Sequence, residues 1–136
     1  MKFYRIILLS FTFLALTSFS VPKAHDFNLL KKVWITQSYD KEKMIFSYKA
    51  KKRMPKKRLA FQFLENGKLK VRQNNSWCGT IGKNERINYE TFEGSWEKIS
   101  DSVFVMKYPR WGMDSTQKMH ILELTDDILV TKILSQ

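Results

Sequence analysis

Short runs of β-branched and aromatic residues recur along the chain, and clusters of polar residues or glycine separate them. No run of twelve or more residues has the spacing of an amphipathic helix. This pattern is typical of an antiparallel β meander. We expect eight strands, over residues 31–37, 43–49, 58–64, 68–73, 87–97, 102–108, 117–124 and 128–134.

The segment from Leu59 to Arg72 predicts a hairpin that turns at Asn66-Gly67. A two-residue loop would place Phe63 opposite Lys70, so that aromatic and cationic side chains would share a face. A type I turn over residues 64–67, with Gly67 as a left-handed bulge residue, instead pairs Phe63 with Leu69. The predicted inward face is Leu59, Phe61, Phe63, Leu69 and Val71, and the outward face is Lys68, Lys70 and Arg72.

Eight sequential antiparallel strands commonly form either a closed barrel or a two-sheet sandwich. Closure removes the unpaired strand edges, and the sequential hairpins leave no long crossovers of the kind that Greek keys need. Cys78 is the only cysteine, so no internal disulfide can stabilise the fold. We therefore predict an all-β protein with an eight-stranded antiparallel up-and-down barrel, and the sandwich is the alternative.

The N-terminus has the pattern of a secretory signal. Lys2 and Arg5 precede an apolar stretch over residues 6–19, and the chain then turns polar. The stretch is shorter than the roughly 20 residues that span a bilayer, so an uncleaved anchor is the less favoured alternative. We predict a signal peptide over residues 1–20 and one exported domain over residues 21–136, in the periplasm or secreted.

Positive charge is concentrated in one region. Residues 41–72 hold twelve Lys or Arg against two acidic residues, whereas the rest of the exported domain is nearly neutral. We predict contact with an anionic lipid or envelope polymer, and a solvated connector is the alternative. Nucleic acid is a disfavoured partner because the protein is exported. The predicted contact residues are Lys49, Lys51, Lys52, Arg53, Lys56, Lys57, Arg58, Lys68, Lys70 and Arg72.

Several motifs follow one another along the chain. They are Trp34, Phe61 to Gly67, Trp77-Cys78-Gly79-Thr80, Gly94-Ser95-Trp96, Tyr108 to Gly112 and Ile121 to Leu129. In this order they resemble the short exported bacterial proteins grouped as lipocalin-like, which have calycin-type barrels. The resemblance implies an eight-stranded barrel with an interior cavity for an apolar molecule.

Aromatic residues are the candidates for lining such a cavity, with access past Tyr108 and Trp111. In small barrels these side chains fill the interior by default, which is the competing interpretation. The candidate pocket residues are Trp34, Phe61, Phe63, Trp96, Tyr108 and Trp111.

Catalytic and metal-binding patterns are lacking in the sequence. His25 and His120 have no partners at metal-ligand spacing, and no nucleophile elbow, phosphate loop or nucleotide fingerprint occurs. We predict neither a catalytic residue, a metal nor a cofactor, with an uncharacterised hydrolase as the minor alternative. Cys78 is interpreted as a buried or loop thiol in a monomer, and a Cys78-linked dimer is the alternative.

The function predicted from the sequence is a non-enzymatic binding module. It would hold an apolar or amphipathic small molecule inside the barrel, while the basic surface contacts anionic envelope components. The alternative is an interaction protein with a packed core, which docks onto an acidic partner through its basic loop.

Overall fold

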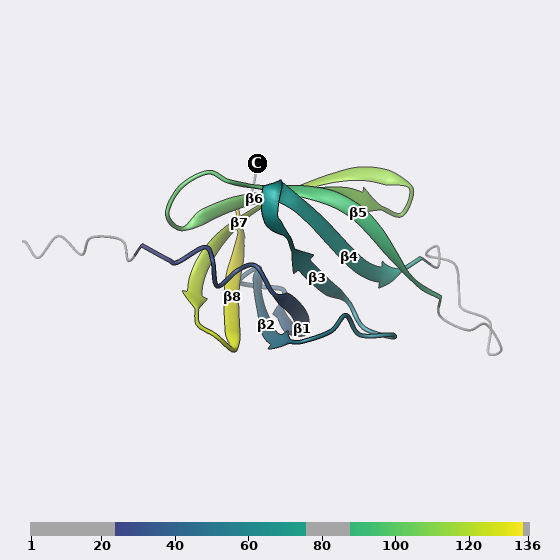
Figure 1. Cartoon of the computed structure of the whole chain (residues 1–136), viewed down its shortest axis with the longest axis horizontal. Helices are drawn as coiled ribbons and strands as arrows, with labels where there is room; N and C mark the ends of the chain where they lie inside the picture. The colour runs from purple at the N-terminus through teal and green to yellow at the C-terminus, as the bar shows by residue number, and fades with distance from the viewer. Residues whose placement is uncertain (1–23, 76–87, 135–136) are drawn as a thin grey trace, which may run out of the picture.

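The computed structural model describes residues 24–75 and 88–134 of the chain. The predicted signal peptide, Trp77 and Cys78 lie outside these residues. The strands are β1 (Val33–Asp40), β2 (Ile45–Lys51), β3 (Ala60–Phe63), β4 (Lys68–Asn74), β5 (Tyr89–Lys98), β6 (Val103–Arg110), β7 (Met113–Leu124) and β8 (Ile128–Leu134), with a 3-10 turn η1 (Glu65–Gly67). They close into an antiparallel barrel (Figure 1), which confirms the predicted fold class over the sandwich. No helix within the described residues is long and apolar enough to cross a membrane.

The strands follow one another around the barrel in the order β1-β2-β8-β7-β6-β5-β4-β3. From β3 to β8 each strand pairs with the next strand in the sequence, as in an up-and-down meander. The first hairpin departs from this order, because β1 lies between β2 and β3 and pairs with both. The chain must therefore cross β1 between residues 52 and 59, a segment that we call the crossover (lower right in Figure 1).

The crossover explains a small second core on the outside of the barrel. Trp34 points into the main core, so its neighbours Val33 and Ile35 point outward, yet both are buried. Together with Ala60 they form a separate apolar cluster, against which Met54 of the crossover packs. The apolar side chain of Met54 thus holds the basic crossover against the barrel.

Arg72 of β4 also holds this segment against the barrel. Its Nε and Nη2 atoms donate hydrogen bonds of 3.3 and 3.0 Å to the main-chain oxygen of Lys56, and its Nη1 donates to Thr91 Oγ1 at 3.1 Å. At the end of the crossover, the main-chain N–H of Thr36 donates to the oxygen of Leu59. Arg72 therefore has a structural partner that its place on the outward face did not indicate.

The hairpin of β3 and β4 has the predicted register. Phe63 pairs with Leu69 and Phe61 with Val71, all four side chains are buried, and Gly67 has a positive φ of 72°. Asn66 is also left-handed, with a φ of 59°, so the turn differs from the expected type I geometry. Asparagine tolerates this region better than most residues. At Gly67 a Cβ atom would lie 2.9 Å from the main-chain oxygen of Trp96, so the turn requires glycine.

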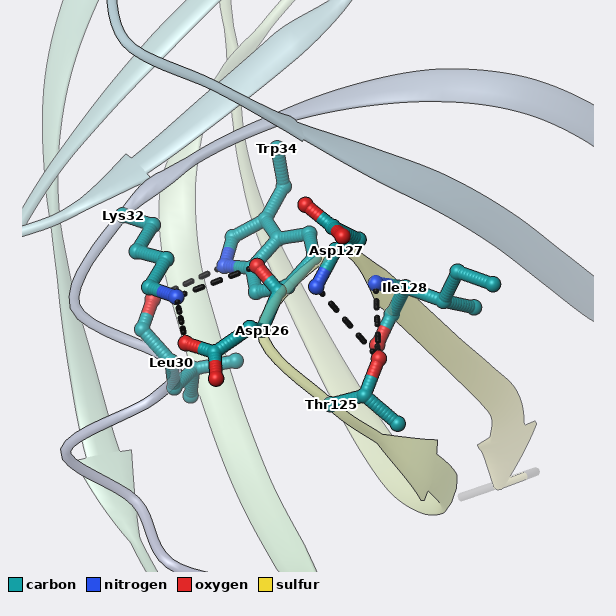
Figure 2. Close-up of polar contacts among 7 residues, drawn as sticks. All are labelled: Leu30, Lys32, Trp34, Thr125, Asp126, Asp127 and Ile128. Atoms are coloured by element: carbon teal, nitrogen blue, oxygen red, sulfur yellow. Dashed lines mark hydrogen bonds and ion pairs between the residues drawn. The ribbon is translucent and has the colours of Figure 1, made fainter.

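The N-terminal segment over residues 24–32 closes one end of the barrel, which we call the closed end. Leu30 is fully buried, and its main-chain oxygen accepts a 2.9 Å hydrogen bond from Trp34 Nε1. Figure 2 shows this bond beside the β7–β8 turn, where the Lys32 ammonium contacts the Asp126 carboxylate at 2.6 Å. Because Asp126 is largely exposed, that ion pair contributes little to stability. The segment is held in place mainly by the burial of Leu30 and Trp34.

Candidate ligand pocket at the open end of the barrel

The opposite end of the barrel, which we call the open end, is where β4 and β6 finish and β5 and β7 begin. A cavity of about 240 Å³ lies here. Its aromatic wall consists of Phe46, Tyr48, Phe61, Tyr89, Tyr108 and Trp111. Its polar lining consists of Gln73, Asn74, Arg110 and Gln117. Leu59 is the one aliphatic residue among the described residues that line the cavity. The cavity thus combines stacking surfaces with a few polar groups, as small-molecule sites do.

The pairing between β5 and β6 ends before the open end. Their pairing covers only Ser95–Lys98 with Phe104–Lys107, although both strands continue toward the open end. Gly94 lies at the point of separation, where a Cβ atom would be 2.3 Å from the main-chain oxygen of Lys107. Beyond it, the side-chain amide of Gln73 bridges to β6 by donating a 2.7 Å hydrogen bond to the oxygen of Pro109.

Ring contacts fix the aromatic wall. Phe61 meets Tyr48 edge-to-face at a centroid distance of 6.0 Å and Tyr108 at 5.8 Å. Tyr48 lies nearly parallel to Phe46, and Phe46 stacks on Tyr39 with centroids 4.2 Å apart. Edge-to-face and offset-stacked pairs are the favoured aromatic geometries, so these contacts hold the rings of the wall against one another.

Two phenol groups supply neutral hydrogen-bonding sites in the wall. Burial raises the pKa of Tyr48 far above its usual value, with a smaller contribution from Tyr108. Burial also raises the pKa of Tyr108, an effect that the nearby Arg110 guanidinium partly opposes. Both groups therefore stay protonated at neutral pH, and Tyr108 Oη donates a 3.2 Å hydrogen bond to Gln117 Oε1.

Two threonine hydroxyls lie behind this wall. Thr36 pairs with Tyr48 across β1 and β2, and Thr131 pairs with Phe46 across β2 and β8. The hydroxyl of Thr131 is close enough to lower the pKa of Tyr48 somewhat, in opposition to burial. Neither threonine Oγ1 has good hydrogen-bond geometry with a partner within the described residues, although both atoms are buried. Such unsatisfied groups are uncommon in barrel interiors and place extra polarity next to the pocket.

The tip of the β6–β7 hairpin forms part of the rim and extends at the upper right of Figure 1. Trp111 and Gly112 both have positive φ values, of 51° and 75°. For a bulky residue such as tryptophan this conformation is an outlier, which costs roughly 1–3 kcal/mol. Trp111 remains 41% exposed, and the Arg110 guanidinium lies 4.3 Å from its ring centroid.

The structure divides the predicted pocket residues into two groups. Phe61, Tyr108 and Trp111 line the cavity, together with residues that the sequence did not single out. Trp34, Phe63 and Trp96 do not line it and instead pack at the closed end, where Trp96 Nε1 donates to the oxygen of Leu64. The strand alternation indicates that a side chain points inward, but not how far along the barrel axis it lies.

Sequence reasoning missed the inward-facing polar residues. Each continues the buried series of its own strand toward the open end. These series are Leu69-Val71-Gln73, Phe104-Met106-Tyr108-Arg110 and Ile121-Met119-Gln117. A polar residue that takes the next inward position of an apolar series is a signal that could have identified this rim.

The predicted basic residues form a surface that we call the basic face, which covers four neighbouring strands. Lys49 and Lys51 lie on β2, Lys68, Lys70 and Arg72 on β4, and the crossover lies between these strands over β1 and β3. All of the predicted cations are exposed except Arg72, which is partly buried. Lys70 pairs with Glu93 of β5, so the face becomes less positive at that edge.

Within the part of the chain that the structure describes, no group of three or more His, Cys, Asp or Glu side chains could hold a metal ion. His120 lies on β7 and pairs with Val103 and Lys132 in the neighbouring strands. It therefore occupies an ordinary strand position.

Comparison with protein-family models, with curated proteins and with solved structures gave no match in any of the three. The similarity to calycin-type proteins consequently rests on the closed, eight-stranded antiparallel barrel alone.

Proposed function

We propose that this protein is an exported, non-enzymatic binding module that holds a small amphipathic molecule in the open-end pocket. One observation carries the proposal: an aromatic-walled cavity of about 240 Å³ occupies one end of a barrel whose other end is packed. A barrel that served only as a scaffold would gain stability by filling that space with apolar side chains.

The volume favours a ligand built on one ring. An apolar cavity of about 150 Å³ already binds benzene, whereas drug-sized pockets hold about 300–1,000 Å³. The pocket lies between these sizes, which suits one ring with polar substituents. The phenols of Tyr48 and Tyr108 and the amides of Gln73 and Gln117 would orient those substituents.

Binding of a neutral ring compound tests this function. In a titration with benzyl alcohol followed by protein NMR, we expect saturable shifts for Phe61 and Tyr108. The Leu59→Trp variant should abolish them, because Leu59 lines the cavity and a larger side chain would fill it. Ile128→Trp is the matched control, since Ile128 is exposed in β8 away from the pocket. Shifts that persist in Leu59→Trp, or no saturable binding to the unmodified protein, would contradict a pocket function.

The basic face supports a second component of the proposal, contact with anionic envelope lipid or polymer. Each cation near an anionic lipid surface contributes about 1 kcal/mol. The crossover alone presents five exposed Lys or Arg between residues 52 and 58, and no acid. Met54 and Arg72 hold this segment against the barrel, so its charges stay on one face.

Vesicle binding distinguishes this component from the pocket. We expect sedimentation with phosphatidylglycerol vesicles that weakens as salt is raised, and loss of binding when Lys52, Arg53, Lys56 and Lys57 are changed to Gln. A matched variant would change Lys98, Lys107, Lys118 and Lys132 instead. Equal binding to phosphatidylcholine vesicles, or equal loss in the two variants, would argue against a lipid-binding face. A packed-core docking protein would show vesicle or partner binding but no ring binding.

A further inference from the structure

Among the described residues, Arg110 is the one charged side chain that lines the pocket. It occupies the next inward position of β6 after Phe104, Met106 and Tyr108, so the strand directs it toward the barrel opening. Its guanidinium lies over the Trp111 ring, which limits the directions that the group can take.

This guanidinium has no anionic partner among the described residues. No described Asp or Glu lines the pocket, and no ion pair or hydrogen bond joins Arg110 to a described side chain. Glu90 lies near this rim, since it pairs with Gln73, but Asn75 and Asn88 donate to its two carboxylate oxygens at 2.7 and 2.9 Å. Asp114 pairs with Pro109 across the hairpin and makes no ion pair with another described residue.

We propose that the pocket selects small aromatic carboxylates, with the ring against Phe61 and Tyr108 and the carboxylate on the Arg110 guanidinium. This inference rests on the proposed pocket function and adds the class of ligand. The planar fork of a guanidinium matches a carboxylate with two parallel hydrogen bonds, which a lysine could not provide. The Gln117 amide, which lines the same pocket, offers further N–H donors.

The position of the charge fits such a ligand. Tyr108 lies two residues before Arg110 on the same face of β6 and contacts Phe61. A ring held against these two side chains would place a substituent on its outward side near the rim. The pocket combines an aromatic wall with a cation at the end of β6, which matches a molecule that has a ring at one end and an anionic group at the other.

Paired probes test the proposal. Benzoate and benzamide have nearly the same size and shape but differ in charge, so their dissociation constants are compared by NMR titration. We expect benzoate to bind about tenfold more tightly, the effect of one charge-assisted hydrogen bond. In Arg110→Gln the two dissociation constants should agree within twofold, so that the preference for benzoate disappears. Lys107→Gln, which removes the same charge from an outward position of β6, should keep the preference.

The outcomes separate this inference from the proposed function. Equal binding of both probes, or a preference that survives in Arg110→Gln, would overturn carboxylate selection and leave a pocket for neutral rings. Absence of binding by both probes and by benzyl alcohol would remove the pocket function itself. Inorganic phosphate is the third probe: competition by phosphate as strong as that by benzoate would mean that Arg110 binds anions in general, and would also overturn the inference.

Discussion

The two ends of the barrel are built from the same strands in opposite ways. At the closed end, Trp34, Phe104 and Leu30 are almost fully buried, and the N-terminal segment covers them. At the open end, the inward positions of β4, β6 and β7 pass from apolar residues to Gln73, Arg110 and Gln117. The difference indicates that tight apolar packing and a polar-rimmed cavity are separated along the barrel axis, since each of these strands contributes apolar burial at one end and a polar rim at the other.

Backbone strain shows the same division. Among the described residues, the three non-glycine residues with positive φ are Met44, Asn66 and Trp111. At the closed end the residue is Asn66, which suits that conformation. At the open end the residues are Met44 and Trp111, large side chains that hold this conformation at a cost and stay partly exposed. Of these two residues Trp111 lines the cavity, whereas Met44 lies in the β1–β2 turn.

Matched truncations at the two ends should have the largest effect. Phe104→Ala removes a ring that is 1% exposed and meets Phe63 edge-to-face, so we expect a loss of about 3–5 kcal/mol in unfolding free energy. Phe46→Ala removes a half-buried ring beside a cavity that water can enter, so its cost should be less than half of that. Urea unfolding measures both. Equal losses would show that the open end is as tightly packed as the closed end.

The boundary between the two ends can be tested at Gly94. The Gly94→Ala methyl would approach the Lys107 oxygen and the Tyr108 Cβ atom, at 2.3 and 2.8 Å, so β5 and β6 must move apart. We expect a loss of about 1–3 kcal/mol, as in overpacked cores, together with altered NMR shifts of Tyr108. Gly112→Ala is the control, because a Cβ atom there meets no atom within 4 Å and only its positive φ resists the change. If Gly94→Ala lowered the unfolding free energy less than Gly112→Ala, β5 and β6 would not be in close contact at Gly94.

Arg72 connects the basic crossover to the sheet at the open end. Arg72→Gln removes two hydrogen bonds to the Lys56 oxygen and one to Thr91, so we expect a loss of about 1–2 kcal/mol and faster tryptic cleavage within residues 52–58. Lys70→Gln changes the adjacent outward cation, which is exposed, and should leave both measurements nearly unchanged. If both variants are cleaved at the same rate, Arg72 does not hold the crossover.

Local rules predicted the eight strands and the β3–β4 register from the sequence. At that hairpin, the alternation of apolar and polar residues and the position of Gly67 favour the register that puts aromatic and cationic side chains on opposite faces. The structure has this register. The position of β1 between β2 and β3 could not be predicted in this way. It depends on Met54 covering Val33 and Ile35, a contact between segments that are distant in sequence.

The candidate site could be predicted only in part. The alternation of side chains along each strand correctly predicts that four of the residues point inward, namely Trp34, Phe61, Phe63 and Tyr108. The position of each side chain along the barrel axis depends on the stagger of the strands, which this pattern does not give. The β5–β6 pairing also ends next to Gly94, before the open end, which no local pattern in either strand reveals. The position of Arg110 at the rim could have been predicted, because it follows the inward residues Phe104, Met106 and Tyr108 at the same spacing on β6.

The smallest expected effect is the one that most directly links strain to binding. In Trp111→Asn the new residue suits the left-handed conformation, so the unfolding free energy should rise by about 1 kcal/mol, seen as a higher thermal midpoint. The same change removes an aromatic wall and the ring on which the Arg110 guanidinium lies, so binding of benzoate should weaken at least severalfold. Asn66→Gly is the control at the closed end, where the native residue already suits its conformation. It should neither raise the unfolding free energy nor weaken the binding of benzoate. A Trp111→Asn protein that is stabilised and still binds benzoate normally would show that the strained tryptophan serves no purpose in the pocket.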